Sequence, residues 1–352
     1  MNKKYFLWTL GCQMNVSDSE RLTQKLEDLG LKSAPEKEAD LIIVNACSVR
    51  QKAVDRIWGK IKIWQEVQKK IYLTGCVLPE DQKKFIAKGI KIFQIKKLGK
   101  LLKKTSTKGW VALVPIMTGC DNFCTYCVVP FTRGREISRP MKDILKDARD
   151  ALDSGSKEIL LLGQNVNSYC KHSSAYNSGF TSLLEEIDKL PGNFQFNFLS
   201  SNPHDFSDKL IEALARLKKW PRELHLPLQS GDDEILRRMN RRYTSAQYLN
   251  LVKNLKLKIE NLSADRQDLK LSTDIIVGFP GETKKQFENT VKLCRKIGFE
   301  KAYLAQYSPR PGTAAFKLKD NVPPKEKKRR WQILNNLINK RNGRKQMICS
   351  RP

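Results

Sequence analysis

The segment MTGCDNFCTYCVVP at residues 117–130 carries a C-x3-C-x2-C pattern made by Cys120, Cys124 and Cys127. Structural zinc normally takes four ligands, often as C-x2-C pairs, and the three histidines of the chain are all distant from this segment in sequence. Cysteine thiolates also hold 4Fe–4S clusters, normally with four cysteines per cluster. Iron and sulfur therefore fit this segment better than zinc, and a cluster held by three cysteines leaves one iron free to bind another ligand.

Three further cysteines end β-rich apolar runs in the first hundred residues. The runs are YFLWTLGC at 5–12, DLIIVNAC at 40–47 and KIYLTGC at 70–76. Helical stretches lie between them, such as SDSERLTQKLEDLG, for which we expect an N-cap at Ser17 or Ser19 and a C-terminal glycine at Gly30. This alternation predicts an open parallel sheet with crossover helices.

The carboxyl ends of parallel strands share one edge of a sheet, where ligands bind. We therefore expect Cys12, Cys47 and Cys76 to converge, although about 30 residues separate each from the next. A single buried cysteine at a strand end usually only packs. Three cysteines at three strand ends predict a second site with three thiolates.

A second alternating series follows residues 94–111, which are basic and punctuated by glycine. We place a domain boundary between residues 107 and 108. The expected strands are 111–117, 157–163, 194–200, 222–228, 269–277 and 300–307, with helices between them at 139–155, 180–190 and 283–298. Six βα units are too few for the eight-stranded barrel. We predict an α/β protein with an N-terminal open parallel-sheet domain at 1–107 and a partial barrel of six βα units at 108–322.

The sequence from 323 to 352 begins with a double proline and reads as a basic helix. Its charge has two explanations that the sequence leaves equally open, a solvated helix face and a face that contacts RNA.

The composition limits the partners of the chain. Lys plus Arg number 65 against 37 Asp plus Glu, giving a net charge of +28 and a pI near 9.8. A polyanionic partner, nucleic acid before an anionic membrane, is the simplest explanation, and a generally lysine-rich proteome is the alternative. No apolar run approaches the roughly 18 residues of a membrane span. The start MNKKYFLWTLGC imitates a short signal but is better explained as a first strand, so we expect a cytoplasmic protein.

Nine cysteines in a cytoplasmic chain favour metal or redox chemistry over disulfides. Six of the nine are accounted for above. Cys294 lies in an amphipathic helix and is expected in the core, Cys170 lies in a loop beside the expected cofactor edge, and Cys349 has no partner at a useful spacing.

The C-x3-C-x-aromatic-C pattern, with Tyr126 before the last cysteine, resembles the radical S-adenosylmethionine superfamily. TLGCQMNVSDSE, VNACSVR and LTGC resemble its methylthiotransferase family, and the resemblance covers nearly the whole chain. It implies two 4Fe–4S clusters. The cluster at Cys120, Cys124 and Cys127 would bind S-adenosylmethionine and cleave it to a radical that abstracts a hydrogen atom. The cluster at Cys12, Cys47 and Cys76 would hold or supply sulfur, and a second S-adenosylmethionine would provide the methyl group.

The resemblance also implies contacts to S-adenosylmethionine. Besides Tyr126, the candidates are Gln164 and Asn165 for the methionyl amine, Gln229, Ser230 and Arg242 for ribose and carboxylate, and Gly278 and Gly281 for close approach to adenine. Each of these stretches could equally be an ordinary βα loop that needs glycine to turn.

Family members divide by substrate, and GCQMNVSDSE and GQNVNSY look like the branch that acts on isopentenyladenosine beside the tRNA anticodon. The alternatives are threonylcarbamoyladenosine in tRNA, an aspartate of a ribosomal protein, or a non-catalytic iron–sulfur or zinc protein that binds RNA. The expected partners are the tRNA anticodon stem-loop and an electron donor such as flavodoxin or ferredoxin, with no membrane and a monomeric chain. Relatives usually continue into a small β-rich RNA-binding module, which we expect to be missing after QMICSRP.

Overall fold

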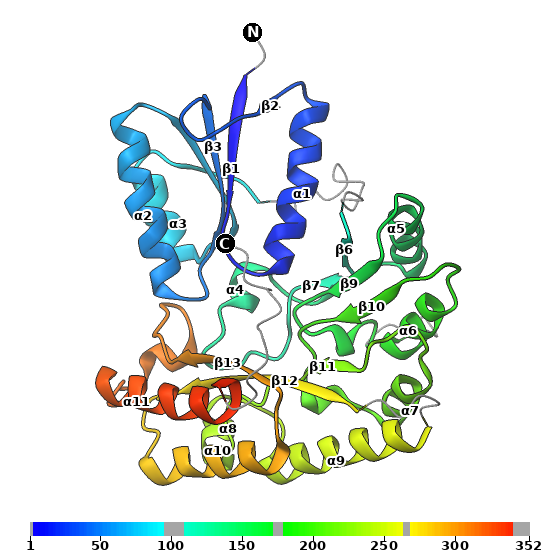
Figure 1. Cartoon of the computed structure of the whole chain (residues 1–352). Helices are drawn as coiled ribbons and strands as arrows, with labels where there is room; N and C mark the ends of the chain where they lie inside the picture. Colours follow the sequence, from blue (N-terminus) through cyan, green and yellow to red (C-terminus); the bar gives the residue numbers. More distant parts are fainter. Residues whose placement is uncertain (1–2, 95–108, 172–178, 263–267, 341–352) are drawn as a thin grey trace.

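The computed structural model describes residues 3–94, 109–171, 179–262 and 268–340. Its N-terminal part is a five-stranded sheet of order β2-β1-β3-β4-β5 in which every pair of neighbours is parallel. The elements in chain order are β1 Lys4–Thr9, α1 Gln13–Asp28, β2 Lys32–Ser33, β3 Leu41–Cys47, α2 Gln51–Glu66, β4 Lys70–Cys76, α3 Pro79–Ala87 and β5 Lys91–Ile92. In Figure 1, α1 lies on one side of this sheet, and α2 and α3 lie on the other.

The predicted parallel sheet is confirmed, and the predicted start of its first helix is wrong. α1 begins at Gln13 with Cys12 as its N-cap residue, five residues before the expected Ser17 and seven before Ser19. Ser19 lies inside the helix, where its hydroxyl accepts hydrogen bonds from Thr9 Oγ1 at 2.7 Å and Asn45 Nδ2 at 2.8 Å. Because Thr9 on β1 and Asn45 on β3 both bond to this hydroxyl, Ser19 is not available to cap a helix that begins later. The helix does end before Gly30, which has a φ of +81°.

The six strands expected after residue 108 are all present, and the predicted fold class is confirmed. They are β6 Val111–Pro115, β9 Glu158–Leu162, β10 Gln195–Phe198, β11 Glu223–His225, β12 Lys270–Val277 and β13 Lys301–Gln306. They form two parallel three-stranded sheets, β10-β9-β6 and β11-β12-β13. β10 and β11 touch where the two sheets meet, so the strands together curve into an open partial barrel (Figure 1).

Helices cover the outside of this partial barrel. They are α5 Met141–Asp153, α6 Phe180–Asp188, α7 Asp208–Arg216, α8 Asp233–Arg238, α9 Ser245–Leu262, α10 Lys284–Ile297 and α11 Pro324–Asn335, the last continued by a π-helical turn at Asn336–Lys340. Short 3-10 turns lie at Val166–Ser168, Pro203–Asp205 and Ala314–Lys317. Apolar faces of these helices and strands form one large core, while α2, α3 and the N-terminal sheet enclose a second. Cys294 is buried in the larger core, as its helical pattern predicts.

A buried ion pair fastens the N-terminal sheet to the barrel. Arg310, in the loop after β13, is 1% exposed, and its Nη2 lies 2.6 Å from Asp81 Oδ2 at the start of α3. Arg310 also donates to the Gln51 side chain at the start of α2. Because two helices of the N-terminal part contribute, this arginine holds the carboxyl edge of the sheet over the barrel.

The domain boundary expected at residues 107 and 108 lies outside the described residues, as does Cys349. The basic C-terminal helix is present as α11, and it packs against β12 and β13. Lys327 and Arg330 of α11 are buried and ion-paired with Asp320 and Glu282, so part of the helix charge is structural.

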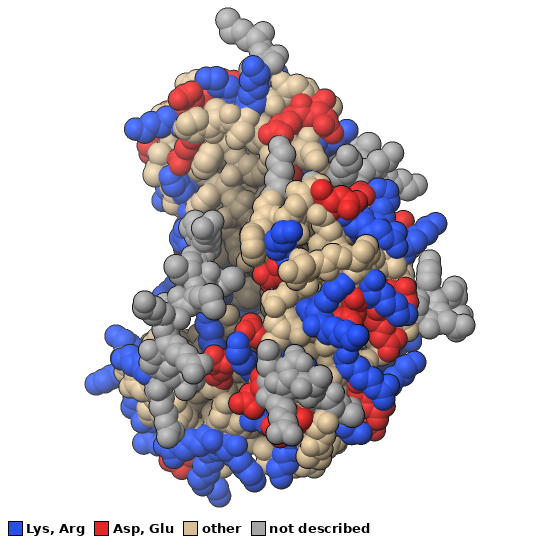
Figure 2. Space-filling view, turned by 45° about the vertical axis from the view of Figure 1, so that its right-hand side comes forward, with Lys and Arg blue, Asp and Glu red and all other residues tan. Residues whose placement is uncertain are grey.

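Lys and Arg side chains are spread over much of the face shown in Figure 2, around a hollow lined largely by uncharged residues. Within the described ranges, no helix has both the length and the apolar character needed to cross a membrane.

Candidate active site

The three cysteines of the C-x3-C-x2-C segment lie on one loop that is closed at its base. Strands β7 (Met117–Thr118) and β8 (Ile137–Ser138) pair antiparallel on either side of it. Gly119 has a φ of +83°, and a β-carbon there would overlap the backbone carbonyl of Arg135 across the loop. Glycine at this position therefore allows the two arms of the loop to approach each other next to the first cysteine.

Each thiol of this loop receives an N–H hydrogen bond. Asn122 Nδ2 lies 3.6 Å from Cys120 Sγ, Arg241 Nη1 lies 3.4 Å from Cys124 Sγ, and the Val129 amide lies 3.5 Å from Cys127 Sγ. Burial raises the pKa of Cys120 to about 11 and that of Cys127 to about 12. Donors aimed at buried sulfur atoms are suited to thiolates that carry negative charge when they bind metal.

The N-terminal cysteines converge as predicted. Cys47 and Cys76 are the last residues of β3 and β4, and they are direct partners in the parallel register. Cys12 lies beside them, because Asn15 Oδ1 is 4.0 Å from Cys12 Sγ and 3.7 Å from Cys76 Sγ. A β-carbon on the preceding Gly11 would come within 2.9 Å of the Cys47 β-carbon, so only glycine allows this close approach.

The donor set of these two groups suits an iron–sulfur cluster. Burial raises the pKa of Cys47 to about 11 and also raises that of Cys76, so both thiols release a proton when metal binds. In the described part of the chain, no group of three His, Cys, Asp or Glu side chains is close enough together to hold a single metal ion. His225 has its own partners, Ser272 and Asp274. Three soft thiolates without a nearby imidazole fit a multinuclear cluster better than one zinc ion.

Arg133 joins the two cysteine groups. It directly follows α4 (Val129–Thr132), which begins two residues after Cys127, and α4 contacts β4. Its Nε lies 3.0 Å from Cys76 Sγ, and its Nη2 lies 2.7 Å from Asn15 Oδ1 and 2.9 Å from Asp18 Oδ2. A guanidinium from the loop of one group thus lies against a thiol of the other.

The two residues predicted after β9 lie beside the cysteine loop. Gln164 Oε1 accepts a hydrogen bond of 2.6 Å from the Gly119 amide, so its carbonyl is occupied in positioning the loop. Asn165 is buried and donates to Asp205 Oδ2 at 2.9 Å, while its Oδ1 has no hydrogen-bond partner within the described ranges. A buried free acceptor at this edge fits an amine donor of a bound ligand.

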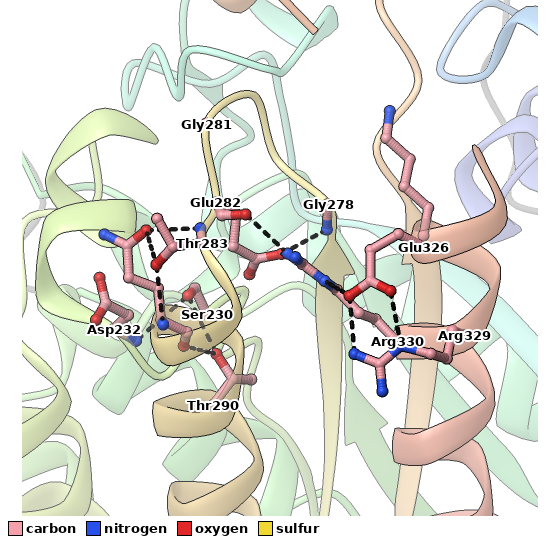
Figure 3. A network of polar contacts seen from close by, with 12 residues as sticks. Ser230, Asp232, Gly278, Gly281, Glu282, Thr283, Thr290, Glu326, Arg329 and Arg330 are labelled. Carbon is pink, nitrogen blue, oxygen red and sulfur yellow. Dashed lines mark hydrogen bonds and ion pairs between the residues drawn. The ribbon is translucent and has the colours of Figure 1, made fainter. Parts of the chain in front are cut away.

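Gln229 and Ser230 follow β11 and differ in what they face. Gln229 is buried with a φ of +66°, and its Oε1 has no hydrogen-bond partner among the residues that the structure describes. Ser230 is turned to α10, where its hydroxyl lies 3.4 Å from Thr290 Oγ1 (Figure 3). Gln229 therefore has an acceptor to offer a ligand, whereas Ser230 is used in packing.

Gly278 and Gly281 follow β12 with φ of +69° and +76°. A β-carbon on Gly278 would overlap the Lys327 stem, and one on Gly281 would come within 2.7 Å of Arg238 Nη1. Glu282 accepts from the Gly278 amide at 2.7 Å and pairs with Arg330 Nη1 of α11 at 2.6 Å (Figure 3). Both glycines thus have a structural reason to be glycine, and their contact with adenine stays a prediction.

Tyr126 and the arginines after α8 complete the predicted set. Tyr126 packs against a small apolar cluster that includes Met239 and Phe279, and burial raises its pKa well above the ordinary value. Arg242 is exposed. Its neighbour Arg241 reaches the thiol of Cys124 and also Asn202 Oδ1 at 3.2 Å.

Comparisons with known proteins agree with this arrangement. Two family profiles match, the radical SAM superfamily over residues 114–294 and the uncharacterized protein family UPF0004 over residues 4–95. The chain is 40% identical to the tRNA-2-methylthio-N(6)-dimethylallyladenosine synthase of Thermotoga petrophila, over 97% of this chain and 83% of that protein. It is 37% identical to the synthase of the same name from Neisseria meningitidis, over 97% of this chain and 85% of that protein.

The chain belongs to the radical SAM methylthiotransferase family. The cofactors of this family, S-adenosylmethionine and 4Fe–4S clusters, are those that the two thiol groups suit. Among solved structures, the radical S-adenosylmethionine methyltransferase TsrM from Kitasatospora setae shares its fold, with a TM-score of 0.63 at 14% identity over 90% of this chain and 77% of that one.

Sequence reasoning missed three polar residues at the centre of this methylthiotransferase. Arg133, Asn15 and Arg241 all contact cysteine sulfur, yet none belongs to a cysteine pattern. Asn15 lies three residues after Cys12, on the first turn of α1, and that spacing was the only local signal available.

Proposed function

We propose that this chain is a tRNA methylthiotransferase that adds a methylthio group to C2 of N6-isopentenyladenosine beside the anticodon. The observation that carries the proposal is the pair of three-thiol groups joined by Arg133. Its curated relatives carry the name of the enzyme with this activity over nearly the full length of this chain.

We assign the cofactors by the thiols that would hold them. Cys120, Cys124 and Cys127 would hold the cluster that binds S-adenosylmethionine, and Cys12, Cys47 and Cys76 would hold the auxiliary cluster. When bound, these groups supply radical hydrogen abstraction and a sulfur atom, which acid–base side chains cannot provide at an unactivated ring carbon.

The residues of the chain would bind and orient these cofactors and shield them from solvent. Arg241 and Asn122 donate to sulfur in the first group, and Arg133 places positive charge at the second. The free acceptors of Asn165 and Gln229 would receive the ammonium or hydroxyl groups of S-adenosylmethionine. Arg310 and Asp81 hold the two parts of the chain together, and Arg133 from the loop of the first group contacts Cys76 of the second.

The partners follow from this chemistry. The net charge of +28 supports binding to the anticodon stem-loop of tRNA through phosphate contacts. Reductive cleavage of S-adenosylmethionine needs an electron, for which we propose flavodoxin or ferredoxin. We further propose that the protein acts in the cytoplasm as a monomer without a membrane.

The test is an anaerobic reaction of the reconstituted chain with isopentenylated tRNA, S-adenosylmethionine and dithionite. Mass spectrometry of the digested tRNA should show the methylthio-isopentenyl nucleoside, and the supernatant should contain 5′-deoxyadenosine. Cys120→Ala should lose both products and about half of about eight irons per chain. Cys12→Ala should lose the modified nucleoside. Cys294→Ala is the matched control, since this buried cysteine belongs to neither group.

The alternatives give different results. Methylthiolation only of tRNA carrying threonylcarbamoyladenosine would move the proposal to that substrate. Clusters at full iron content with no 5′-deoxyadenosine would leave a non-catalytic iron–sulfur protein.

A further inference from the structure

Two phenylalanines of the cysteine loop are exposed and in contact with each other. Phe123 is 40% exposed and Phe131 is 46% exposed. Their ring centroids are 6.5 Å apart at an interplanar angle of 80°, an edge-to-face pair. The Arg135 guanidinium lies 5.2 Å from the centroid of Phe123. Single exposed apolar residues are common on proteins, whereas this is a cluster of two rings and a cation.

The two phenylalanines lie on the segment that connects the two thiol groups. Phe123 directly precedes Cys124, and Phe131 lies in α4, between Cys127 and Arg133. Arg133 touches Cys76, so α4 passes from one group to the other. One ring is therefore next to a cysteine of the first group, and the other lies on the helix that leads to the second group.

The backbone holds Phe123 in an unfavourable conformation. Its φ is +48°, a left-handed value that side chains with a β-carbon rarely adopt. Asn240 stabilises it by donating Nδ2 to the carbonyls of Asn122 and Phe123 at 3.1 and 3.0 Å. Strained residues persist where the surroundings enforce them, and they concentrate at sites of function.

Chemistry at C2 of a base requires that the base leave its stack in the anticodon loop. The nucleotide next to it then loses a stacking partner, and proteins commonly replace that partner with aromatic rings or arginine planes. Resting on the function proposed above, we propose that Phe123, Phe131 and Arg135 form a stacking platform for the nucleotide adjacent to the target adenosine. Arg135 pairs with Asp121 at 3.0 Å, but its side chain is 71% exposed, so it can still contact a base face or a phosphate, which favours RNA over an apolar protein partner.

The experiment measures binding of a labelled isopentenylated anticodon stem-loop to the cluster-loaded protein by fluorescence anisotropy. Phe123→Leu/Phe131→Leu keeps the apolar volume and removes both rings, and it should weaken binding roughly 5- to 100-fold. Phe123→Tyr/Phe131→Tyr should bind as the parent chain does. Trp110→Leu is the control, because Trp110 is exposed but lies before β6, at the opposite end of that strand from the cysteines. Iron content is measured for every variant to confirm that the loop is intact.

A second RNA makes the assignment specific. A stem-loop with an abasic site next to the target adenosine should bind the parent chain more weakly by a similar factor. The double leucine variant should bind the abasic RNA and the complete RNA equally well. Equal loss from the abasic site in both proteins would place the stacked base elsewhere and overturn the inference.

The remaining outcomes separate the inference from the proposed function. Absence of RNA binding by the parent chain would overturn both. RNA binding by the double leucine variant equal to that of the parent would overturn the inference alone. If that variant also lost activity relative to the parent chain with a flavodoxin donor but not with dithionite, the rings would belong to an electron-donor surface instead.

Discussion

Arg133 should be the most consequential charged residue between the two thiol groups. Arg133 and Asp18 have side-chain exposures of only 12% and 8%, and their closest atoms are 2.9 Å apart. Arg133→Met keeps most of the side-chain volume but removes the ion-pair partner of the buried Asp18 carboxylate, leaving Arg21 as the remaining positive charge near it. Removing one partner of a buried pair in this way costs about 3–5 kcal/mol of the free energy of unfolding.

The assay is guanidinium unfolding of the metal-free chain under anaerobic, reducing conditions. Arg133→Met should lower the unfolding midpoint strongly. Arg133→Met/Asp18→Asn should recover much of the loss, because it removes the unpaired charge, and Asp18→Asn alone completes the double-mutant cycle. A coupling energy of about 1–3 kcal/mol is expected for residues in direct contact.

A second measurement tests the contact with Cys76. The guanidinium Nε lies 3.0 Å from that sulfur, so its positive charge should favour the reduced, more negative form of a cluster bound there. Arg133→Met should therefore lower the midpoint potential of the auxiliary cluster, and Arg133→Lys should lower it less. Purely additive stabilities in the cycle, together with an unchanged potential in Arg133→Met, would refute the reasoning.

Three further predictions concern stability and cluster loading. Arg310→Met leaves Asp81 buried and unpaired between the two parts of the chain, so it should lower the free energy of unfolding by about 3–5 kcal/mol in guanidinium. An unfolding midpoint equal to that of the parent chain would contradict the role given to this pair. Burial raises the pKa of Glu20 from 4.5 to about 7, so the folded state binds an extra proton and the free energy of unfolding should fall as pH rises from about 4.5 to 7. Glu20→Gln should raise the free energy of unfolding at pH 8 by about 1 kcal/mol after solvent screening, seen as a higher thermal midpoint, and leave it unchanged at pH 4. Gly119→Ala should lose about half of the bound iron, because a methyl group there would overlap a backbone carbonyl. Gly134→Ala is the control, with a similar φ of +84° and open space around it, and it should retain the iron; equal iron in both variants would contradict the prediction.

The positions of the six cysteines show how far the sequence alone could go. Cys47 and Cys76 end strands with a clear apolar pattern, so their meeting at one edge followed from the parallel topology. Cys12 was placed correctly, but the helix after it was expected to begin five or seven residues later. The hydroxyl of Ser19 is used by Thr9 and Asn45, partners that no local helix-start pattern reveals.

The side chains around the thiols were harder to predict. The contact of Arg242 with S-adenosylmethionine stays a prediction, but the sequence did not indicate that its neighbour Arg241 reaches Cys124. The sequence of an irregular loop carries no periodicity, so it does not specify which of two adjacent side chains points inward. Gly278 and Gly281 illustrate the converse, since a glycine pattern typical of close ligand approach is also required by Lys327 and Arg238.

The sequence by itself determined the two thiol groups, the alternation of strands and helices, and the basic charge, because each depends on residue type and short-range spacing. Only the tertiary structure decided that Arg133 spans the groups, that Arg310 fastens the two parts and that Phe123 and Phe131 meet at the surface. The contacts of Arg133 and Arg310 join the N-terminal part to the barrel, so their geometry depends on how the two dock, whereas the contact between the two rings depends on how the cysteine loop folds. Packing of the complete chain selects that docking, and local propensity does not encode it.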